Sequence, residues 1–429
     1  MKLFGSMSVK DNELYIGGVI ATNLAKEYGT PLYVIDEELL RSNCKRYLES
    51  FGGSNVVAYA GKAFLPVAMC QIVNEEGLNL DVVSGGELYT AYKANFPMEK
   101  ILFHGNNKTI DEIKMGISFG VGRFVVDNFY EIEKINEIAA KENIVQKIFL
   151  RITPGIEAHT HEYIKTGQID SKFGFTLSNG DALEAVREAI KFKNIELAGL
   201  HAHIGSQIFE ISPYLEEVDT MLRFIKQIKD EIEYNIKELD LGGGFGIYYT
   251  KEDEPKTTEE FCSAILKEAD KKAGELGIKI PKLIIEPGRS IIGNAGTTLY
   301  TIGSIKDIPG IRKYISVDGG MTDNIRPSLY NAEYECSIAN KFDASKEKVT
   351  ISGKCCESGD ILLTDVEIPE AQSGDLLAVP TTGAYGYSMS SNYNKIPKPA
   401  VVLVKNGTSK LICKRESYED VIKNELSIL

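Results

Sequence analysis

The 429-residue sequence has few of the features that cross-link or anchor a protein. Its seven cysteines are an odd number and include no C-x-x-C pair, which disfavours a disulfide scaffold and a structural zinc site. The longest uncharged stretch, residues 290–305, is interrupted by Gly, Asn and Thr and is too short to cross a bilayer. Residues 1–18 contain no apolar signal segment. We therefore expect a cytoplasmic location and no membrane partner.

The sequence also has fewer basic residues than acidic ones. The chain has 48 Lys and Arg residues against 61 Asp and Glu residues, which gives a formal net charge of −13. Binding to a phosphate backbone requires a basic surface, so a nucleic-acid partner is not expected. The hydrophobic content of 43% is ordinary for a globular protein, and a chain of this length can bury a full core without cross-links.

Short β-rich runs alternate with longer amphipathic segments between residues 55 and 290. The runs that predict strands are residues 56–60, 80–83, 101–104, 123–127, 148–152, 197–204, 238–241 and 283–286. Residues 215–232 illustrate the helical segments, because their apolar side chains recur every three or four positions. Eight such repeats predict an α/β fold with a (β/α)8 TIM-type barrel, and a doubly wound open sheet is the runner-up.

The residue pattern of the sequence changes after residue 290. Short runs rich in Val, Ile, Thr and Tyr alternate with Gly, Pro, Asn and Asp, which is typical of an all-β domain. The strand-like run at residues 13–16 is expected to join the same sheet. The sequence therefore predicts a barrel domain over residues 31–290 and a C-terminal all-β domain over residues 291–429 that also takes in residues 1–30.

Functional side chains of an α/β barrel gather at the carboxyl ends of its strands. Lys62 follows the first predicted strand in an otherwise apolar run, Ala-Tyr-Ala-Gly-Lys-Ala. Apolar surroundings favour the neutral amine, which can form an imine as a nucleophile. The alternative is a lysine whose stem packs at the barrel rim while its ammonium group reaches water.

Glycine-containing turns follow the last two predicted barrel strands. Residues 242–246, Gly-Gly-Gly-Phe-Gly, let backbone N–H groups close around a phosphate, although they match neither a P-loop nor a G-x-G-x-x-G fingerprint. The alternative is a tight turn that needs positive φ. Residues 286–289, Glu-Pro-Gly-Arg, add a second turn on the neighbouring strand, so a phosphate cradle is the favoured interpretation.

Glu286 ends a strongly apolar predicted strand. A carboxylate at that position can hydrogen-bond a ring nitrogen of a cofactor and keep it protonated. The alternative is an ion pair with an arginine of a neighbouring strand, such as Arg151.

His201 and His203 are two positions apart on a predicted strand, so both should point to the same side. This spacing also occurs in metal sites, and His159 with His161 forms a second such pair. Barrel hydrolases, however, usually carry the pair on the first strand. Stacking of the His203 imidazole on a cofactor ring is therefore favoured over a metal site.

Three more segments carry polar or aromatic side chains outside the regular runs. Residues 154–175 form a long stretch of the kind that often acts as a lid. Residues 354–360 and 383–387 of the predicted β-domain include Cys356 and Tyr385. The alternatives for these two side chains are a buried thiol and a packed aromatic ring.

These features together resemble the barrel-type (alanine racemase-like, fold type III) pyridoxal-phosphate decarboxylases. The resemblance extends from about Tyr33 to Tyr393, which is nearly the whole chain. The motifs that carry it, in order, are residues 58–63, 166–167 with 171–174, 203–207, 242–244, 286–289, 326–330, 356–360 and 383–385.

The resemblance implies two catalytic residues and pyridoxal 5'-phosphate as the cofactor. Lys62 would hold the cofactor as an imine, and Cys356 would lie near the reacting carbon. Glu286 would pair with the pyridine nitrogen and His203 would stack on the ring. The whole set implied for cofactor binding is Lys62, Asp81, Arg151, His203, Ser206, Gly243, Gly244, Glu286, Gly288, Arg289 and Tyr385. The set implied for substrate binding is Arg289, Arg326, Tyr330, Glu357 and Tyr385, and no metal is expected.

The implied substrate is an amino acid with a second amino-acid head. Arg289 and Arg326 suit a distal carboxylate because a guanidinium pairs with that group bidentately, and Glu357 suits a distal ammonium. The implied reaction is the decarboxylation of meso-2,6-diaminopimelate at its D-centre to L-lysine and CO₂. The alternatives are a sister decarboxylase for carboxynorspermidine or another basic amino acid, a non-catalytic pyridoxal-phosphate-binding protein, and a metal-dependent barrel hydrolase.

A homodimer with shared active sites is also implied, because in the family the segment around Cys356 reaches into the site of the partner subunit. Cys355 directly precedes that thiol, and the Glu-Ser-Gly-Asp sequence that follows favours Cys356 as the functional cysteine. The sequence assigns no role to His104, Asn107 or Lys108.

Overall fold

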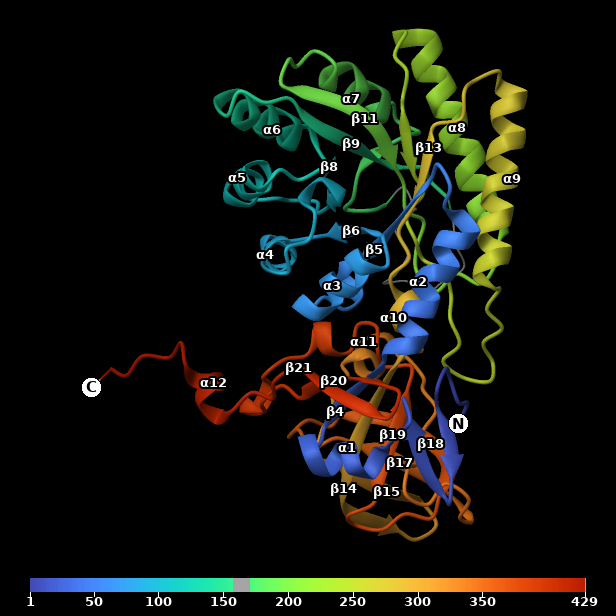
Figure 1. Ribbon diagram of the computed structural model, residues 1–429, viewed down its shortest axis with the longest axis vertical. Coiled ribbons are helices and arrows are strands. Elements are labelled where there is room, and N and C mark those ends of the chain that lie inside the picture. The colour runs from blue at the N-terminus through green and yellow to red at the C-terminus, as the bar shows by residue number, and fades with distance from the viewer. Residues whose placement is uncertain (157–169, 429) are drawn as a thin grey trace. The chain divides into compact units, whose positions relative to one another are not determined.

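The computed structural model describes residues 1–156 and 170–428, which form two compact units (Figure 1). The barrel unit comprises residues 44–246 and 255–290. The β unit comprises residues 1–43 and 247–254 and the chain from residue 291 onward. Among the described residues, every helix is too short or too polar to cross a membrane.

Eight parallel strands close the barrel. They are β5 (Val56–Ala60), β6 (Asn79–Val82), β7 (Ile101–Phe103), β8 (Arg123–Val126), β9 (Gln146–Thr153), β11 (Ile195–His201), β12 (Glu238–Asp240) and β13 (Lys282–Ile285). Strand β13 pairs with β5, and β8 pairs with β9, so the sheet has no open edge there. The predicted barrel is confirmed and the open doubly wound sheet is wrong. A short strand, β10 (Phe175–Thr176), pairs with the carboxyl end of β9.

Helices connect the strands and lie outside them (Figure 1). They are α2 (Glu37–Phe51), α3 (Val67–Glu75), α4 (Gly85–Lys93), α5 (Ile110–Phe119), α6 (Phe129–Lys141), α7 (Asp181–Ala189), α8 (Ser212–Ile232) and α9 (Thr258–Leu276). The side chains of Ser84, Asn128, Thr109 and Thr257 cap four of them by accepting a hydrogen bond from a first-turn N–H group. Such caps fix where each helix begins and therefore hold the loops at the carboxyl ends of the strands.

Small and large apolar side chains from six strands fill the interior of the barrel. They are Ala58, Leu102, Val125, Phe149, Ala198 and Ile284. The barrel is therefore packed rather than hollow, and a ligand can bind only above this layer, at the ends of the strands.

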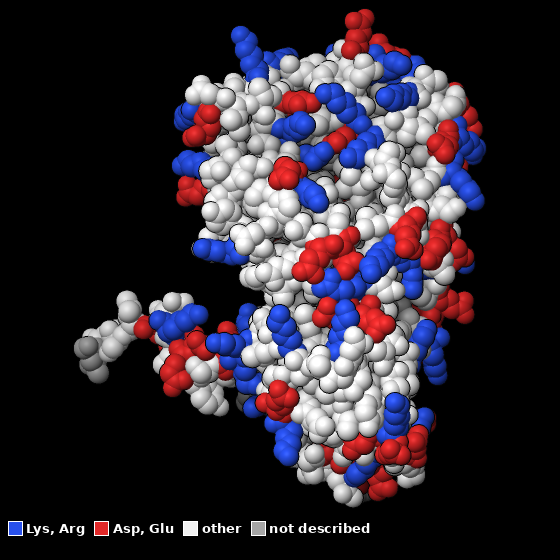
Figure 2. Space-filling model, viewed as in Figure 1, with Lys and Arg blue, Asp and Glu red and all other residues white. Residues whose placement is uncertain are grey.

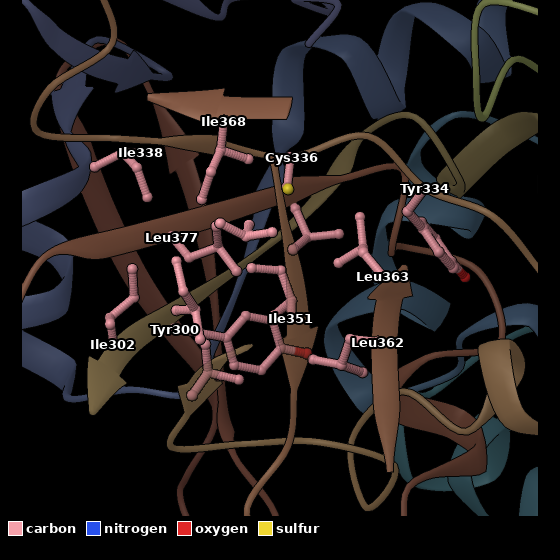
Figure 3. Close-up of a cluster of buried hydrophobic side chains, with 14 of the residues drawn as sticks. Tyr300, Ile302, Tyr334, Cys336, Ile338, Ile351, Leu362, Leu363, Ile368 and Leu377 are labelled. Carbon is pink, nitrogen blue, oxygen red and sulfur yellow. The ribbon is translucent and has the colours of Figure 1, made fainter. Parts of the chain in front are cut away.

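A large sheet forms most of the β unit. Its strands are β4 (Leu32–Asp36), β14 (Gly296–Ile308), β15 (Arg312–Val317), β17 (Lys346–Ser352), β18 (Ile361–Pro369), β20 (Ala400–Lys405) and β21 (Thr408–Cys413), with β16 (Ser337–Ile338) and β19 (Leu376–Pro380) paired alongside β14. Figure 3 shows the apolar cluster that this sheet encloses, with Tyr300, Ile302, Ile351 and Leu377 pointing toward one another. The remaining α-helices of the described residues are short: α1 (Ala21–Tyr28), α10 (Arg289–Ile292), α11 (Arg326–Tyr330) and α12 (Tyr418–Ile422).

Two N-terminal segments differ from the expectation. Residues 13–16 form β2 (Glu13–Ile16), which pairs with β1 (Ser8–Lys10) and β3 (Val19–Ile20) in a separate three-stranded sheet. The N-terminal strand of the large sheet is instead β4, which lies between β14 and β20, although the sequence places it in the barrel domain. All five residues of β4 are buried, so its apolar run has no alternation that could distinguish the two environments.

The surface of the face shown in Figure 2 carries basic and acidic side chains interspersed with one another. Acidic and basic side chains are therefore mixed on this face rather than separated into blocks of one sign.

Candidate active site

A cavity of about 360 Å³ opens at the carboxyl ends of the barrel strands. Its lining residues are Lys62, Val83, His104, Gly105, Asn106, Arg151, Lys172, Phe173, His201, His203 and Glu286. They come from the ends of β5, β6, β7, β9, β11 and β13 and from the segment before β10. Four residues that the sequence singles out on separate strands therefore line one cavity: Lys62, Arg151, His203 and Glu286.

Lys62 lies in a short 3₁₀ turn (Gly61–Ala63) directly after β5. Its Nζ atom is 3.0 Å from Oδ2 of Asp81, which is fully buried on β6. The Lys62 side chain is itself 38% exposed. The buried carboxylate thus holds an amine that remains accessible from the cavity, as a lysine that reacts with a small molecule must be.

Glu286 is buried after β13 and faces two histidines. Its Oε1 atom is 2.6 Å from Nε2 of His104, and its Oε2 atom is 3.3 Å from Nε2 of His201. Burial by itself raises the pKa of Glu286, but the charge and the hydrogen bond of His104, with a smaller effect from His201 beside it, outweigh burial and hold that pKa well below its usual range. Glu286 is therefore an ionised carboxylate at the floor of the cavity.

Arg151 does not pair with Glu286. Its Nε atom is 3.9 Å from Oδ1 of Asp127, and its guanidinium lies over the Phe173 ring at 4.2 Å from the ring centroid. Burial lowers the pKa of this guanidinium. Arg151 thus lines the cavity as a stacked cation.

His104, His201, Asp240 and Glu286 offer potential metal-ligand atoms that all lie within 4.8 Å of one another. A metal ion there would have to replace the 2.6 Å hydrogen bond between His104 and Glu286. Burial lowers the pKa of His201 to about 3, so this imidazole is neutral. The other histidine pair of the sequence, residues 159 and 161, lies outside the described residues.

The glycine-rich turn packs against neighbouring backbone. A Cβ atom on Gly244 would lie 2.2 Å from the carbonyl oxygen of Gly205, and one on Gly243 would lie 2.1 Å from that of Glu286. Gly244 also has a φ of +96°, which satisfies the tight-turn interpretation as well. The N–H of Gly243 donates to Nδ1 of His203 at 3.3 Å. The turn therefore brings bare backbone to the position beside His203.

Cation and hydroxyl groups lie next to this turn. Arg289 is buried, and its Nη2 atom donates to Oγ of Ser206 at 2.9 Å. A Cβ atom on Gly288 would lie 2.9 Å from that of Ala60. A guanidinium, a hydroxyl and closely packed glycines are the groups that bind a phosphate dianion. With the Lys62 amine and the ionised Glu286, they fit pyridoxal phosphate.

The β unit carries the remaining residues of the expected site. Arg326 is buried in α11, where its Nη1 atom donates to the hydroxyls of Tyr249 at 2.9 Å and Tyr334 at 2.8 Å. Tyr330 ends the same helix, which has no acidic residue in its first turn. Tyr385 adopts a left-handed φ of +58°.

Cys356 and Glu357 are exposed on the loop between β17 and β18. Asp360 shapes this loop by accepting hydrogen bonds from the N–H groups of Cys355 at 2.7 Å and Met321 at 2.6 Å. Burial raises the pKa of the Cys355 thiol to about 12. Cys355 is therefore a poor proton donor or nucleophile.

Two residues that the sequence left without a role are buried beside the cavity. His104 contacts Glu286, as described above. The Nζ atom of Lys108 donates to the carbonyls of Gly105 at 2.8 Å and Val125 at 2.7 Å and lies 3.2 Å from Glu131. Lys108 thus joins the loops after β7 and β8, whereas Asn107 is exposed. The Thr-Gly motif at residues 166–167, and most of the expected lid, lie outside the described residues.

Comparisons with known proteins agree with this geometry. The family model described as "Pyridoxal-dependent decarboxylase, pyridoxal binding domain" matches residues 37–293. The diaminopimelate decarboxylase of Bacillus subtilis is 52% identical over 417 residues, covering 96% of this chain and 95% of that protein. The diaminopimelate decarboxylase of Bacillus methanolicus is 52% identical and covers 97% of this chain and 98% of that protein.

Solved structures agree as well. The diaminopimelate decarboxylase of M. jannaschii in complex with L-lysine has a TM-score of 0.92 and 38% identity, with 98% of each chain covered. Fold, site and comparisons define a barrel-type pyridoxal-dependent decarboxylase. Within that class, the chain belongs to the diaminopimelate decarboxylase family.

Proposed function

We propose that this protein decarboxylates meso-2,6-diaminopimelate at its D-centre and yields L-lysine and CO₂, the last step of lysine biosynthesis. The observation that carries the proposal is the 52% identity to diaminopimelate decarboxylases over nearly the whole length of both chains. The L-lysine complex of the M. jannaschii enzyme supports the same product. The cavity also contains the two groups that the reaction requires, an accessible amine and an ionised carboxylate, at the same end of the barrel.

Pyridoxal phosphate, when bound, supplies an electron sink for the electrons of the broken carbon–carboxylate bond. Lys62 would hold its aldehyde carbon covalently, and Asp81 would keep the Lys62 amine in place. Glu286 would hold the pyridine nitrogen protonated, and His203 would lie against the ring. The phosphate would be held by Ser206, Gly243, Gly244, Gly288, Arg289 and Tyr385, and Arg151 would border the ring as a cation.

The substrate's distal end would be held by arginine, tyrosine and glutamate side chains. Arg289 and Arg326 would grip its carboxylate, with Tyr330 and Tyr385 beside them, and Glu357 would meet its ammonium. The two tyrosine hydroxyls that accept from Arg326 fix the plane of this guanidinium, and a fixed plane favours bidentate pairing with a carboxylate.

The reaction removes one carboxylate and adds one proton. When the carbon–carboxylate bond breaks, CO₂ leaves and the same carbon must receive a proton from the protein or water. The exposed Cys356 thiol is the proposed donor, with the Lys62 amine as the other group able to carry a proton to that position.

We also propose a cytoplasmic homodimer with shared sites, in which the loop of Cys356 and Glu357 completes the site of the partner subunit. The exposure of both side chains on that loop supports the arrangement. The test mixes two inactive variants, Lys62→Ala and Cys356→Ala, under conditions that exchange subunits. Shared sites restore partial activity in the mixture, because one site of each hybrid then has both residues. A mixture that stays inactive contradicts shared sites.

The reaction itself is tested with purified protein, pyridoxal phosphate and meso-2,6-diaminopimelate. We expect CO₂ and L-lysine in equal amounts from the parent and neither product from Lys62→Ala. The control is Lys147→Ala, because Lys147 is exposed at the opposite end of β9 from the cavity. Release of CO₂ from another basic amino acid, without lysine formation from diaminopimelate, would contradict the substrate assignment.

A further inference from the structure

A single imidazole nitrogen joins two buried carboxylates beneath the cavity. Nε2 of His104, at the end of β7, is 2.6 Å from Oε1 of Glu286 and 3.8 Å from Oδ1 of Asp81. His104 and Glu286 are each 4% exposed, and Asp81 is fully buried. Asp81 also holds the Lys62 amine through its other oxygen. His104 therefore stands between the amine end of the site and the Glu286 end.

We propose that His104 is a positioning residue, which fixes the Glu286 carboxylate in place and links it electrostatically to the Lys62–Asp81 pair. The inference rests on the proposed function, since it assigns Glu286 to the pyridine nitrogen and Lys62 to the aldehyde of the cofactor.

His104 makes a shorter contact with Glu286 than the neighbouring histidine does. His201 is the other histidine beside Glu286, but it stays 3.3 Å away, and its Nε2 atom has no hydrogen-bond partner. Its ring meets that of His104 edge-on at 4.8 Å between centroids. The neutral His201 imidazole carries no charge of its own, and its effect on the pKa of Glu286 is smaller than that of His104.

A second carboxyl group makes the His104 contact necessary. Asp240, on β12, is fully buried, and its Oδ1 atom accepts from the N–H of Gly242 at 2.9 Å. Burial and the nearby charge of Glu286 raise the pKa of Asp240 well above its usual range. Asp240 therefore carries the proton of this carboxyl pair, and the contact with His104 favours the negative charge on Glu286. Without His104 the pKa of Glu286 would rise, which would weaken its hold on a protonated ring nitrogen.

The charged and titratable groups around His104 come from several elements. Those that interact with it or lie beside it are Asp81 on β6, Glu87 on α4, His201 on β11, Asp240 on β12 and Glu286 after β13, and Lys62 after β5 and Arg151 on β9 line the same cavity. Removing the imidazole would favour protonation at both ends of the site, on Glu286 and on the Lys62 amine. Asp81 would be left to Lys62 alone, which favours the protonated amine, and loss of the pyridinium charge would favour it further.

The test is a pH titration of the absorbance of the lysine-bound cofactor in the full-length protein, with the dissociation constant of pyridoxal phosphate as a second readout. The variants are His104→Ala, which removes the donor, and His104→Gln, which keeps an N–H donor near the Nε2 position. Asn107→Ala is the control, because Asn107 is exposed on the same loop.

In His104→Ala we expect the titration midpoint to rise by about 1 pH unit or more. Cofactor affinity should fall by about 10-fold or more, as expected when a charge-assisted hydrogen bond is lost. His104→Gln should lie between His104→Ala and the parent, and Asn107→Ala should titrate like the parent. A purely structural role would weaken binding without moving the midpoint.

Parent-like midpoints in both His104 variants would overturn the inference. If His104→Ala does not fold, the His104→Gln midpoint decides alone. A parent protein that shows no lysine-bound absorbance at all would instead refute the proposed function, so the two failures give different results.

Discussion

The glycine-rich turn offers the sharpest test of the phosphate cradle, through the substitution Gly244→Ala. The added Cβ atom would lie 2.2 Å from the carbonyl oxygen of Gly205, whereas ordinary contact begins at 3.4 Å. The two backbone segments must therefore separate by on the order of 1 Å, a displacement that can cost about 100-fold in a site that depends on close positioning. The φ of +96° adds a local strain of about 1–2 kcal/mol for any residue with a Cβ atom.

We expect Gly244→Ala to weaken pyridoxal-phosphate binding by about 10- to 100-fold, which corresponds to about 1.4–2.8 kcal/mol. The assay is an equilibrium titration of the apo-protein, followed by the absorbance of the lysine-bound cofactor, with circular dichroism as a check of folding. Gly274→Ala is the matched control, because Gly274 lies in α9 and its added Cβ atom would meet nothing within 4 Å. A folded Gly244→Ala protein that binds the cofactor like the parent would refute the cradle.

Five other substitutions test separate parts of the structure. Lys62→Ala should abolish the absorbance of the lysine-bound cofactor; its persistence would place the reactive lysine elsewhere. Arg326→Ala should raise KM for the dicarboxylate more than it changes cofactor affinity, and an unchanged KM would remove Arg326 from the substrate site. Lys108→Met leaves the buried Glu131 without its cation and should lower the free energy of unfolding of the barrel unit by about 3–5 kcal/mol, whereas adding Glu131→Gln should recover part of that loss in denaturant titrations. His201 binds a proton below about pH 6.5 in the unfolded chain but only below about pH 3 in the folded one, so stability should fall as the pH drops through this window. His201→Asn should flatten the pH dependence, and an unchanged slope would contradict the buried neutral imidazole.

The barrel could be predicted from the sequence because its strands repeat a local pattern. Each β-rich run is short, and each is followed by an amphipathic helix with a capping residue such as Thr109 or Thr257. Strand β5 (Val56–Ala60) was predicted to the residue. The location of β4 could not be predicted in the same way, since a fully buried strand reads as the same apolar run in a barrel and in a sheet between two neighbours.

The same distinction separates the site residues that the sequence indicates from those it does not. Two charged residues stand out because each interrupts or ends an apolar run, Lys62 and Glu286. The 242–246 turn stands out because it is almost entirely glycine. His104 shows no such break: a polar residue at the end of a short strand is common, and its importance depends on what lies opposite. Its two partners, Asp81 and Glu286, come from β6 and from the end of β13.

Those partners are brought together only by closure of the barrel. Strand β13 is the last barrel strand in the sequence and β5 is the first, and their pairing brings Glu286 into the ring of strands that carries His104, which precedes it by 182 positions. Local patterns carry no information about this pairing. The groups that contact a ligand can therefore be found by reading along the chain, whereas the buried groups that orient them depend on the closed sheet. It follows that variants of His104 are a stricter test of the three-dimensional arrangement than variants of Lys62, because only the arrangement gives His104 a role.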